Sequence, residues 1–256
     1  MKKGYPKRKY TLRKPVKKSS QEAIFEITEN KGTYGYGVPR VKAILKRDYG
    51  ISESRYMIHR FMKEKGLLMK RNRKRGSSRP HTGRIAVDEV NTRWASDITS
   101  IKCWNGQKVR LSFIIDCCDR SIIAWKAGLN MQACDIELML QDALINRFGE
   151  SLPKPDQLQF LHDNGPEYIE KQLRKQMKLW NIVDCNTPTY SPQSNGMCEA
   201  LNGTLKRDYV YENYLGNPDI VIGQIQGWID EYNFYAPHSA LNMKTPKEYF
   251  NFKIAA

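Results

Sequence analysis

The sequence predicts an α/β protein in which a mixed five-stranded sheet with flanking helices follows a small all-α domain. Three observations lead to this fold class. Apolar residues recur at helical spacing between residues 19 and 68, strand-like runs with a hairpin signal begin beyond residue 85, and strands then alternate with helices. With 256 residues, the chain is long enough for one sizeable core and a small accessory domain.

The positive charge is concentrated in the N-terminal third of the chain. The formal net charge is +15, but residues 1–84 hold 25 Lys and Arg against 6 Asp and Glu, whereas residues 85–256 hold 17 against 21. Such an excess predicts a polyanionic partner. Six cysteines without a CxxC spacing predict free thiols in a reducing compartment, and no apolar run approaches the roughly 18 residues of a membrane span. We therefore expect a cytoplasmic protein without a membrane partner.

Residues 1–18 are basic and hold two prolines, so we expect a disordered arm. Residues 19–68 predict three short helices. The apolar sets with helical spacing are Ala23, Ile24 and Ile27, then Val41, Ile44 and Leu45, and finally Met57, Ile58, Phe61 and Met62.

The third helix presents a cationic face opposite its apolar face. This face holds Arg55, His59, Arg60 and Lys63. A Gly/Ser/Pro-rich basic linker, residues 69–84, follows directly and contributes Lys70, Arg71, Arg73, Lys74 and Arg75. We interpret residues 19–68 as a helix-turn-helix domain that binds DNA through these side chains. The alternative is an ordinary surface helix with a charged side.

Residues 85–256 predict the sheet and its helices. The expected order begins with three strands, the first two joined by an Asn-Gly turn at 105–106, which is a strong hairpin signal. The strands are expected at 92–104, 107–118, 121–129, 156–165 and 182–188, and the helices between them at 133–149 and 167–180. A third helix and a C-terminal helical extension complete the core. Ligand sites in such sheets lie at the carboxyl ends of the strands.

Three acidic residues are candidates for a shared site. Asp97 lies inside the first strand among apolar or small residues, where a lone charge would be costly. Asp163 ends the fourth strand, and Glu199 lies near the start of a helix. The 35 residues between Asp163 and Glu199 form a helix, a strand and a loop, about the length needed to return the chain beside the fourth strand. Taken singly, each acid could be a strand-end, turn or helix-start residue.

Four stretches in this order resemble a known family. They are "WASDIT", "FLHDNGPEY", "YSPQSNGMCEALNGTLKRDYV" and "YNFYAPHSALNMKTPKEYF". The chain resembles the integrase-type core of bacterial insertion-sequence transposases, the product of their second reading frame, within the retroviral-integrase and ribonuclease-H-like superfamily. The resemblance extends over nearly the whole chain from about residue 20. It implies a ribonuclease-H-like fold and a catalytic triad of Asp97, Asp163 and Glu199.

The chemistry that the resemblance implies suits three carboxylates. Phosphodiester transfer is assisted by two Mg²⁺ or Mn²⁺ ions, and such hard cations take oxygen ligands. Asp97, Asp163 and Glu199 are thus the expected metal ligands. Water would first attack at the element end, and the 3′-hydroxyl that is left would then attack target DNA in line. No covalent protein intermediate is implied.

Four other residues near these acids in the sequence are candidates for DNA contacts or for structural roles. Lys206 lies seven residues after Glu199 on the same helical face and is expected to hold the DNA backbone, and Asn195 in the preceding loop is a second candidate DNA contact. We expect Asp116, a competing acid in the second strand, to be structural. His162 could either tune the metal ligand Asp163 or simply pack against its neighbours.

These features together predict a DNA transposase or integrase that cuts and joins the ends of an insertion element. Two alternatives remain: a DNA-binding regulator with an inactive core, and a structure-specific ribonuclease-H-like nuclease. The expected partners are double-stranded DNA, namely element ends and target, further copies of this chain on that DNA, and an upstream reading-frame product. The expected location is the bacterial nucleoid.

Overall fold

The computed structural model describes residues 17–30, 33, 35–69, 86–149, 158–186 and 196–255. Most of the expected arm and linker therefore lie outside the described residues. The same holds for the candidate DNA contacts Lys70, Arg71, Arg73, Lys74, Arg75 and Asn195. Among the helices of the described ranges, none has the length and apolar character needed to cross a bilayer.

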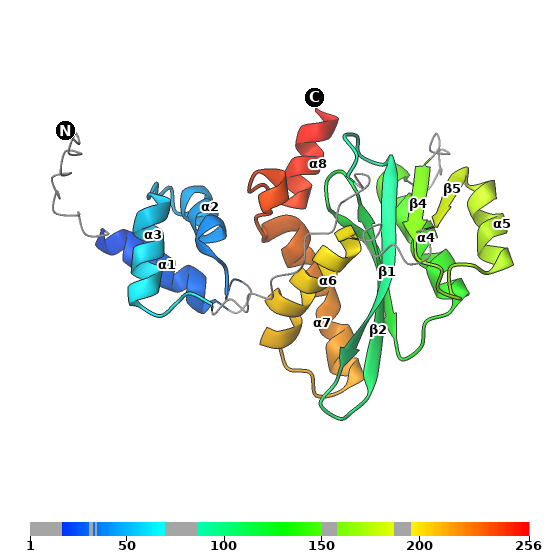
Figure 1. The fold of residues 1–256 in the computed structure, drawn as a ribbon, viewed down its shortest axis with the longest axis horizontal. Helices are drawn as coiled ribbons and strands as arrows, with labels where there is room; N and C mark the ends of the chain where they lie inside the picture. The colour runs from blue at the N-terminus through cyan, green and yellow to red at the C-terminus, as the bar shows by residue number, and fades with distance from the viewer. Residues whose placement is uncertain are drawn as a thin grey trace, which may run out of the picture.

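Three helices form the N-terminal domain (Figure 1). They are α1 (Lys18–Glu29), α2 (Val38–Asp48) and α3 (Arg55–Glu64). All the expected apolar residues of these helices are buried in one cluster except Met57, which packs at its margin. Ser54 caps α3 by accepting a hydrogen bond from the Met57 backbone N–H, and Pro39 stands in the first turn of α2. The predicted all-α domain is confirmed.

A mixed five-stranded sheet forms the centre of the remaining chain. Its strands are β1 (Arg93–Lys102), β2 (Lys108–Asp116), β3 (Ile122–Gly128), β4 (Leu158–His162) and β5 (Ile182–Asn186). The order across the sheet is β3-β2-β1-β4-β5. β1, β2 and β3 pair antiparallel, while β4 pairs parallel to β1 and to β5. The predicted hairpin meander followed by βαβ units is therefore confirmed.

Helices cover both faces of this sheet (Figure 1). On one face, α4 (Ala133–Phe148) and α5 (Lys171–Leu179) bury an apolar cluster against Trp94 and Phe160. On the other face, α6 (Gly196–Asp208) and α7 (Pro218–Asp230) pack against alternate residues of the hairpin such as Leu111 and Phe113. Side chains of a strand alternate between faces, so one hairpin supplies both cores.

The C-terminal extension packs beside the edge strand β3. It consists of η2 (Val210–Glu212), α7, η3 (Glu231–Tyr235), η4 (Ser239–Leu241) and α8 (Pro246–Ile254). The side-chain amide of Asn233 accepts the Ile122 backbone N–H at 2.9 Å and donates to the Ile122 carbonyl at 2.9 Å. Asn146 of α4 donates to the Ile123 carbonyl at 3.0 Å. Two amide side chains thus occupy backbone groups that a further strand would use.

The N-terminal domain packs directly against this extension. Arg40 of α2 donates to the buried carboxylate of Asp208, at the end of α6, at 2.6 Å and to the Pro237 carbonyl at 3.0 Å. Arg47 stacks over the ring of Tyr235, and Ala236 is buried within the hydrophobic core of the three helices. The domain that we expect to bind DNA is therefore joined to the helix that carries Glu199.

One helix begins later than the sequence pattern indicates. We expected a helix from Glu167, but α5 starts at Lys171 and residues 166–168 form a turn. The reason is a tertiary contact, because the Tyr168 side chain is only 1% exposed and its hydroxyl lies 2.8 Å from the Ser96 hydroxyl of β1. This turn brings the residues after Asp163 back over the sheet.

Candidate active site

Asp97 and Asp163 lie side by side because their strands are parallel neighbours. In the register of β1 and β4, Trp94 is opposite Phe160 and Ala95 is opposite Leu161. Asp97 comes two residues after Ala95, still within β1, and Asp163 comes two residues after Leu161, directly beyond the end of β4. Neighbouring strands are about 4.8 Å apart, so these two acids lie near each other, just beyond the point where the pairing of β1 with β4 ends. Asp97 is half-buried, whereas Asp163 is exposed.

Glu199 lies in the first turn of α6, close enough to Asp97 for its charge to raise the pKa of that carboxyl. The helix is anchored by Cys198, Leu201 and Leu205, which are buried against the sheet, so Glu199 in its first turn is left exposed. Tyr209, directly beyond the end of α6, is buried in the same apolar cluster.

The electrostatics of Asp97 connect the three acids. Burial raises the pKa of Asp97, and the negative charges of Asp163 and Glu199 raise it further. A hydrogen bond from Asn202 Nδ2 to Asp97 Oδ2, at 2.7 Å, acts in the opposite direction. Asn202 lies one helical turn after Glu199, so α6 supplies both a third carboxylate and a donor to the first. The site therefore concentrates negative charge that has no cationic partner among these contacts.

The three carboxylates are not arranged as a compact set of metal ligands in this structure. Within the part of the chain that the structure describes, no group of three or more His, Cys, Asp or Glu side chains is arranged tightly enough to hold a metal ion. Asn202 occupies one oxygen of Asp97, and the Gly165 backbone N–H donates to Asp163 Oδ1 at 2.9 Å.

A fourth carboxylate, Glu167, lies in the turn after Asp163. A Cβ added at Gly165 would lie 3.0 Å from Asp163 Oδ1 and 3.1 Å from Glu167 Oε2, so both carboxylates flank this glycine. Arg110 of β2 forms an ion pair with Glu167 at 2.7 Å. The sequence alone assigns no role to Glu167. Its one sequence signal was its place four residues after Asp163.

A buried polar network contacts the residues that precede Asp97 and Asp163. The His162 ring is fully buried, with Nδ1 2.6 Å from the Asp163 carbonyl oxygen and Nε2 2.9 Å from an Asp184 carboxylate oxygen. It stacks on the Tyr168 ring with centroids 4.8 Å apart, and the Tyr168 hydroxyl contacts Ser96. His162 precedes Asp163 and Ser96 precedes Asp97, so the network holds both strand segments that carry the acids.

Asp116 has a different environment from the three candidate acids. It is fully buried at the end of β2 and accepts hydrogen bonds from the backbone N–H groups of Asn91, Cys118 and Asp119. Burial, reinforced by the charge of Asp119, raises its pKa to about 6. Asp116 is opposite Trp94 in the pairing of β1 and β2, three residues away from Asp97. Its hydrogen bonds to the backbone of Cys118 and Asp119 hold the turn between β2 and β3.

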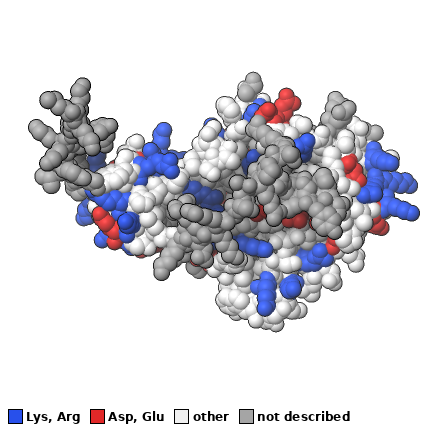
Figure 2. All heavy atoms as spheres, in the orientation of Figure 1, with Lys and Arg blue, Asp and Glu red and all other residues white. Residues whose placement is uncertain are grey.

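The candidate DNA contacts on α3 divide into two groups. Arg55, His59 and Lys63 are exposed and lie one helical turn apart, so they form a single line along the helix. Arg60 differs from our expectation of a freely presented cation, because its side chain is only 23% exposed and lies 3.6 Å from Glu64. Figure 2 shows lysine and arginine side chains on the surface of this N-terminal domain.

Lys206, the candidate backbone contact on α6, is half-buried. It follows Glu199 by two helical turns and Asn202 by one, so the three residues lie on one face of the helix. This arrangement agrees with the expected face, while the contact with DNA stays a prediction.

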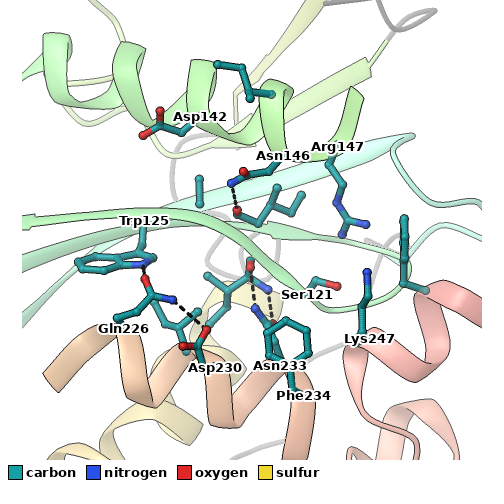
Figure 3. Close-up of a pocket in the computed structure, with 16 residues that line it drawn as sticks. Ser121, Trp125, Asp142, Asn146, Arg147, Gln226, Asp230, Asn233, Phe234 and Lys247 are labelled. Atoms are coloured by element: carbon teal, nitrogen blue, oxygen red, sulfur yellow. Dashed lines mark hydrogen bonds between the residues drawn. The ribbon is translucent and has the colours of Figure 1, made fainter. Parts of the chain in front are cut away.

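A separate cavity of about 460 Å³ lies at the opposite edge of the sheet (Figure 3). It is lined by β3, α4, α7, η3 and α8, with Trp125, Arg147, Asn233 and Lys247 among its side chains. Asp97, Asp163 and Glu199 are not among its lining residues. This cavity is therefore separate from the three acids, and we base the candidate active site on the acids.

Known proteins resemble both parts of this chain. Residues 87–192 and 184–246 each match a family described as "Integrase core domain", and residues 20–75 match one described as "HTH-like domain". The "Insertion element IS136 uncharacterized protein" of Agrobacterium tumefaciens is 39% identical over 189 residues, which cover 73% of this chain and 96% of that protein. Transposase InsD of insertion element IS2 from Escherichia coli is 34% identical over 227 residues, covering 85% of this chain and 73% of InsD.

The fold has a similar solved counterpart. A chain in the cryoEM structure of the simian T-cell lymphotropic virus intasome has a TM-score of 0.55 at 19% identity, covering 82% of this chain and 74% of that chain. This likeness supports the ribonuclease-H-like arrangement of the sheet and its helices.

Proposed function

Because this chain belongs to the transposases of bacterial insertion elements that carry an integrase core domain, we propose that Asp97, Asp163 and Glu199 are its catalytic acids. The protein is a DNA transposase of the polynucleotidyl transferase class. The observation that carries the assignment is the pairing of β1 with β4, which sets Asp97 and Asp163 two residues beyond the partners Ala95 and Leu161, while α6, which holds Glu199, contacts Asp97 through Asn202. Three acids from β1, the end of β4 and α6 thus act on one another.

The donor set fits divalent metal ions. Asp97, Asp163 and Glu199 offer only carboxylate oxygens, which Mg²⁺ and Mn²⁺ prefer, and the repulsion among these acids is what a cation would relieve. We propose two such ions, with the acids as ligands. When bound, they supply Lewis-acid activation of the attacking oxygen and charge stabilisation of the phosphate.

The protein's own groups position the reaction. Asn202 orients the Asp97 carboxylate, and the Gly165 N–H orients that of Asp163. We assign to Lys206 the binding of a DNA phosphate beside Glu199. In the first step a water oxygen bonds to phosphorus at the element end as the P–O bond to the 3′ oxygen of the element strand breaks, leaving that strand a 3′-hydroxyl. In the second, this hydroxyl attacks a target phosphate in line and the target strand's own 3′ oxygen leaves. No protein side chain is bonded to DNA in either step.

The remaining proposals concern partners. We assign DNA binding to Arg55, His59 and Lys63 of α3, with Arg60 held by Glu64 until DNA competes for it, and to the basic run from Lys70 to Arg75. Joining two ends to one target requires several copies of this chain on DNA, and an upstream reading-frame product is a further candidate partner. We place this activity at the bacterial nucleoid. Neither an inert regulator nor a structure-specific nuclease is favoured by any observation.

Conservative replacement of the acids tests the assignment. In Asp97→Asn, Asp163→Asn and Glu199→Gln, cleavage and strand transfer of element-end DNA with Mg²⁺ or Mn²⁺ should fall by about three orders of magnitude or more, because ligand charge is lost with little change of shape. Binding of the same DNA, followed by fluorescence anisotropy, should persist. Glu170→Gln, an exposed acid before α5, is the matched control and should keep full activity. Undiminished products from any of the three variants would remove that residue from the site.

A further inference from the structure

The β1–β2 hairpin extends well beyond the rest of the sheet. β1 and β2 pair over nine positions from Trp94 to Lys102, whereas β4 pairs with β1 only from Arg93 to Ala95. In Figure 1 the hairpin turn and the connection between α6 and α7 meet at the lower edge of the core, away from β4 and β5. The free end of the hairpin therefore projects past the acids along the direction of β1.

Two large aromatic side chains are displayed at this end. Trp104, in the turn, is 65% exposed, and Tyr214, in the α6–α7 connection, is 58% exposed. Their rings meet edge to face with centroids 4.6 Å apart. Exposed aromatic surface is costly in water, and here two rings are paired outside the core. The Cβ of any residue at Gly216 would lie 2.5 Å from the Tyr214 ring, so a glycine leaves space for that ring.

The backbone beneath these rings is held firmly. The Trp104 N–H donates to the Leu215 carbonyl at 2.8 Å, and Gln224 of α7 donates to the Tyr214 carbonyl at 2.8 Å. The turn is closed by Asn105, whose side chain contacts the Gln107 backbone and side chain. The aromatic pair is thus presented on a fixed scaffold, which lowers the entropic cost of binding a flat partner.

Positive charge accompanies the pair. Lys102 and Lys108 face each other across the hairpin, both are exposed, and neither forms an ion pair within the described part of the chain. Residues 98–115 contain no Asp or Glu. On the face drawn in Figure 2, the lower part of the core shows lysine and arginine among uncharged residues. Aromatic rings with flanking lysines match nucleic acid, whose bases stack and whose phosphates are anionic.

The distance to the acids suits a duplex. Lys102 lies five residues after Asp97 on one strand, which at about 3.3 Å per residue is roughly 17 Å. Because five is an odd number, the two side chains leave β1 on opposite faces, so DNA that contacts both must lie along the edge of β1 beyond Ala95, where β4 no longer pairs. B-DNA rises about 3.4 Å per base pair, so this span equals about five base pairs. DNA whose reacting phosphate lies at the acids would pass the aromatic pair about half a helical turn away.

We propose that Trp104, Tyr214, Lys102 and Lys108 form a second DNA-binding surface, the hairpin-tip surface, which holds duplex DNA about five base pairs from the reacting phosphate. The rings contact sugars or an unstacked base, and the lysines contact phosphates. This inference rests on the proposed function, because it takes the acids as the place of reaction. The duplex is either the element end or the target.

Branched DNA that mimics the strand-transfer product tests the surface. Its element arm and its target arm are shortened in turn from about fifteen to about three base pairs, and affinity is measured by fluorescence anisotropy. Wild-type protein should lose roughly tenfold in affinity when one particular arm is shortened, and Trp104→Ala/Tyr214→Ala should bind long and short forms of that arm alike. The sensitive arm identifies the source of the duplex. Lys102→Gln/Lys108→Gln should reduce the salt dependence of binding to the long arm by about two counterions.

Phe252→Ala is the control, since this aromatic residue of α8 is 53% exposed but distant in the chain from the hairpin. The proposal is overturned if the double variant loses equal affinity for long and short arms, or none. It is also overturned if the double variant changes only the oligomeric state in the absence of DNA, measured by sedimentation, since the rings would then bind another protein copy. Absence of strand-transfer product from wild-type protein would instead contradict the proposed function, while the arm-length comparison is read from binding alone.

Discussion

Gly165 lies so close to two carboxylates that only a residue without a side chain fits there. It lies between Asp163 and Glu167 in the sequence, and a Cβ at this position would lie only 3.0 Å from an Asp163 carboxylate oxygen and 3.1 Å from a Glu167 carboxylate oxygen. Its backbone N–H also holds Asp163 Oδ1. Any Cβ would therefore displace a carboxylate that we assign to catalysis.

Gly165→Ala should accordingly impair activity more than stability. We expect strand transfer to fall roughly tenfold to a hundredfold, because the Asp163 carboxylate must shift by a few tenths of an ångström or more. The free energy of unfolding should change by less than about 1 kcal/mol. Gly223→Ala in α7, where a Cβ meets nothing within 4 Å, is the control and should leave activity intact. Equal activity of both variants would show that Asp163 has no need of this close approach.

The buried side chain of His238 should make the stability of the fold depend on pH. Burial, reinforced by the charge of Arg40, lowers its pKa from 6.5 to about 4. A pKa depressed in the folded state contributes stability that is complete above pH 6.5 and is lost as the pH falls from 6.5 towards 4. Up to about 3 kcal/mol should be lost across this window.

Urea unfolding between about pH 7.5 and pH 4.5 measures this effect. His238→Gln should flatten the dependence, since its side chain cannot gain a proton, whereas His59→Gln on the exposed face of α3 should retain the wild-type slope. If wild type and His238→Gln lose stability in parallel, other groups cause the acid sensitivity.

At the scale of elements, β1 and β4 are held together by more than their short ladder. Only three residue pairs join them, from Arg93 to Ala95 on β1. Beyond that point, the Tyr168 hydroxyl bonds to Ser96, and the Tyr168 ring packs on His162 at the end of β4. The turn after β4 thus continues the connection where the ladder stops, directly beneath the acids.

Tyr168→Phe removes one oxygen atom from this connection. The buried Ser96 hydroxyl would lose its partner at 2.8 Å, so the free energy of unfolding should fall by about 1 to 2 kcal/mol. The Mg²⁺ concentration for half-maximal cleavage should also rise, because Asp97 and Asp163 are held less firmly. Tyr211→Phe, at a side chain that is 72% exposed, should change neither quantity. A loss of stability with an unchanged Mg²⁺ requirement would restrict Tyr168 to a structural role.

Elements with strong local signals could be predicted from the sequence, whereas contacts between distant segments could not. The Asn-Gly turn and the apolar spacing of residues 41–45 specified a hairpin and a helix. The three acids could be proposed because each lies within or next to a recognisable element, and their shared role stays a prediction. By contrast, the turn at Tyr168 replaced an expected helical turn because of Ser96, a partner 72 residues away. Arg60 was expected on an open face, and its ion pair with Glu64, four residues later on the same helix, is a local contact that the spacing could have indicated.

At the scale of the whole molecule, a buried ion pair joins the N-terminal domain to the core. The Asp208 side chain is 3% exposed and that of Arg40 is 17% exposed, with 2.6 Å between them. Asp208 stands at the carboxyl end of α6, where a negative charge opposes the helix dipole. Arg40 and Arg207 offset that cost, and only Arg40 comes from the other domain.

A double-mutant cycle measures this connection. Arg40→Met should lower the free energy of unfolding by about 3 kcal/mol, because Asp208 would stay buried with one partner fewer. Adding Asp208→Leu should recover a substantial part of the loss, since no uncompensated charge remains. Lys18→Met, whose partner Glu22 is an exposed residue of the same helix, is the control and should cost little. Strictly additive losses for Arg40 and Asp208 would show that the two charges do not depend on each other.

The amide groups that cover β3 bear on how copies of this protein can assemble. Asn233 offers Ile122 the same donor and acceptor that an adjoining strand would, and Asn146 takes the next carbonyl. A second molecule therefore cannot add a strand to β3 at these positions without displacing both amides. Where the proposed assembly of copies on DNA uses this side of the molecule, the copies must meet through helices or loops, and separating them after joining breaks no strand pairing at β3.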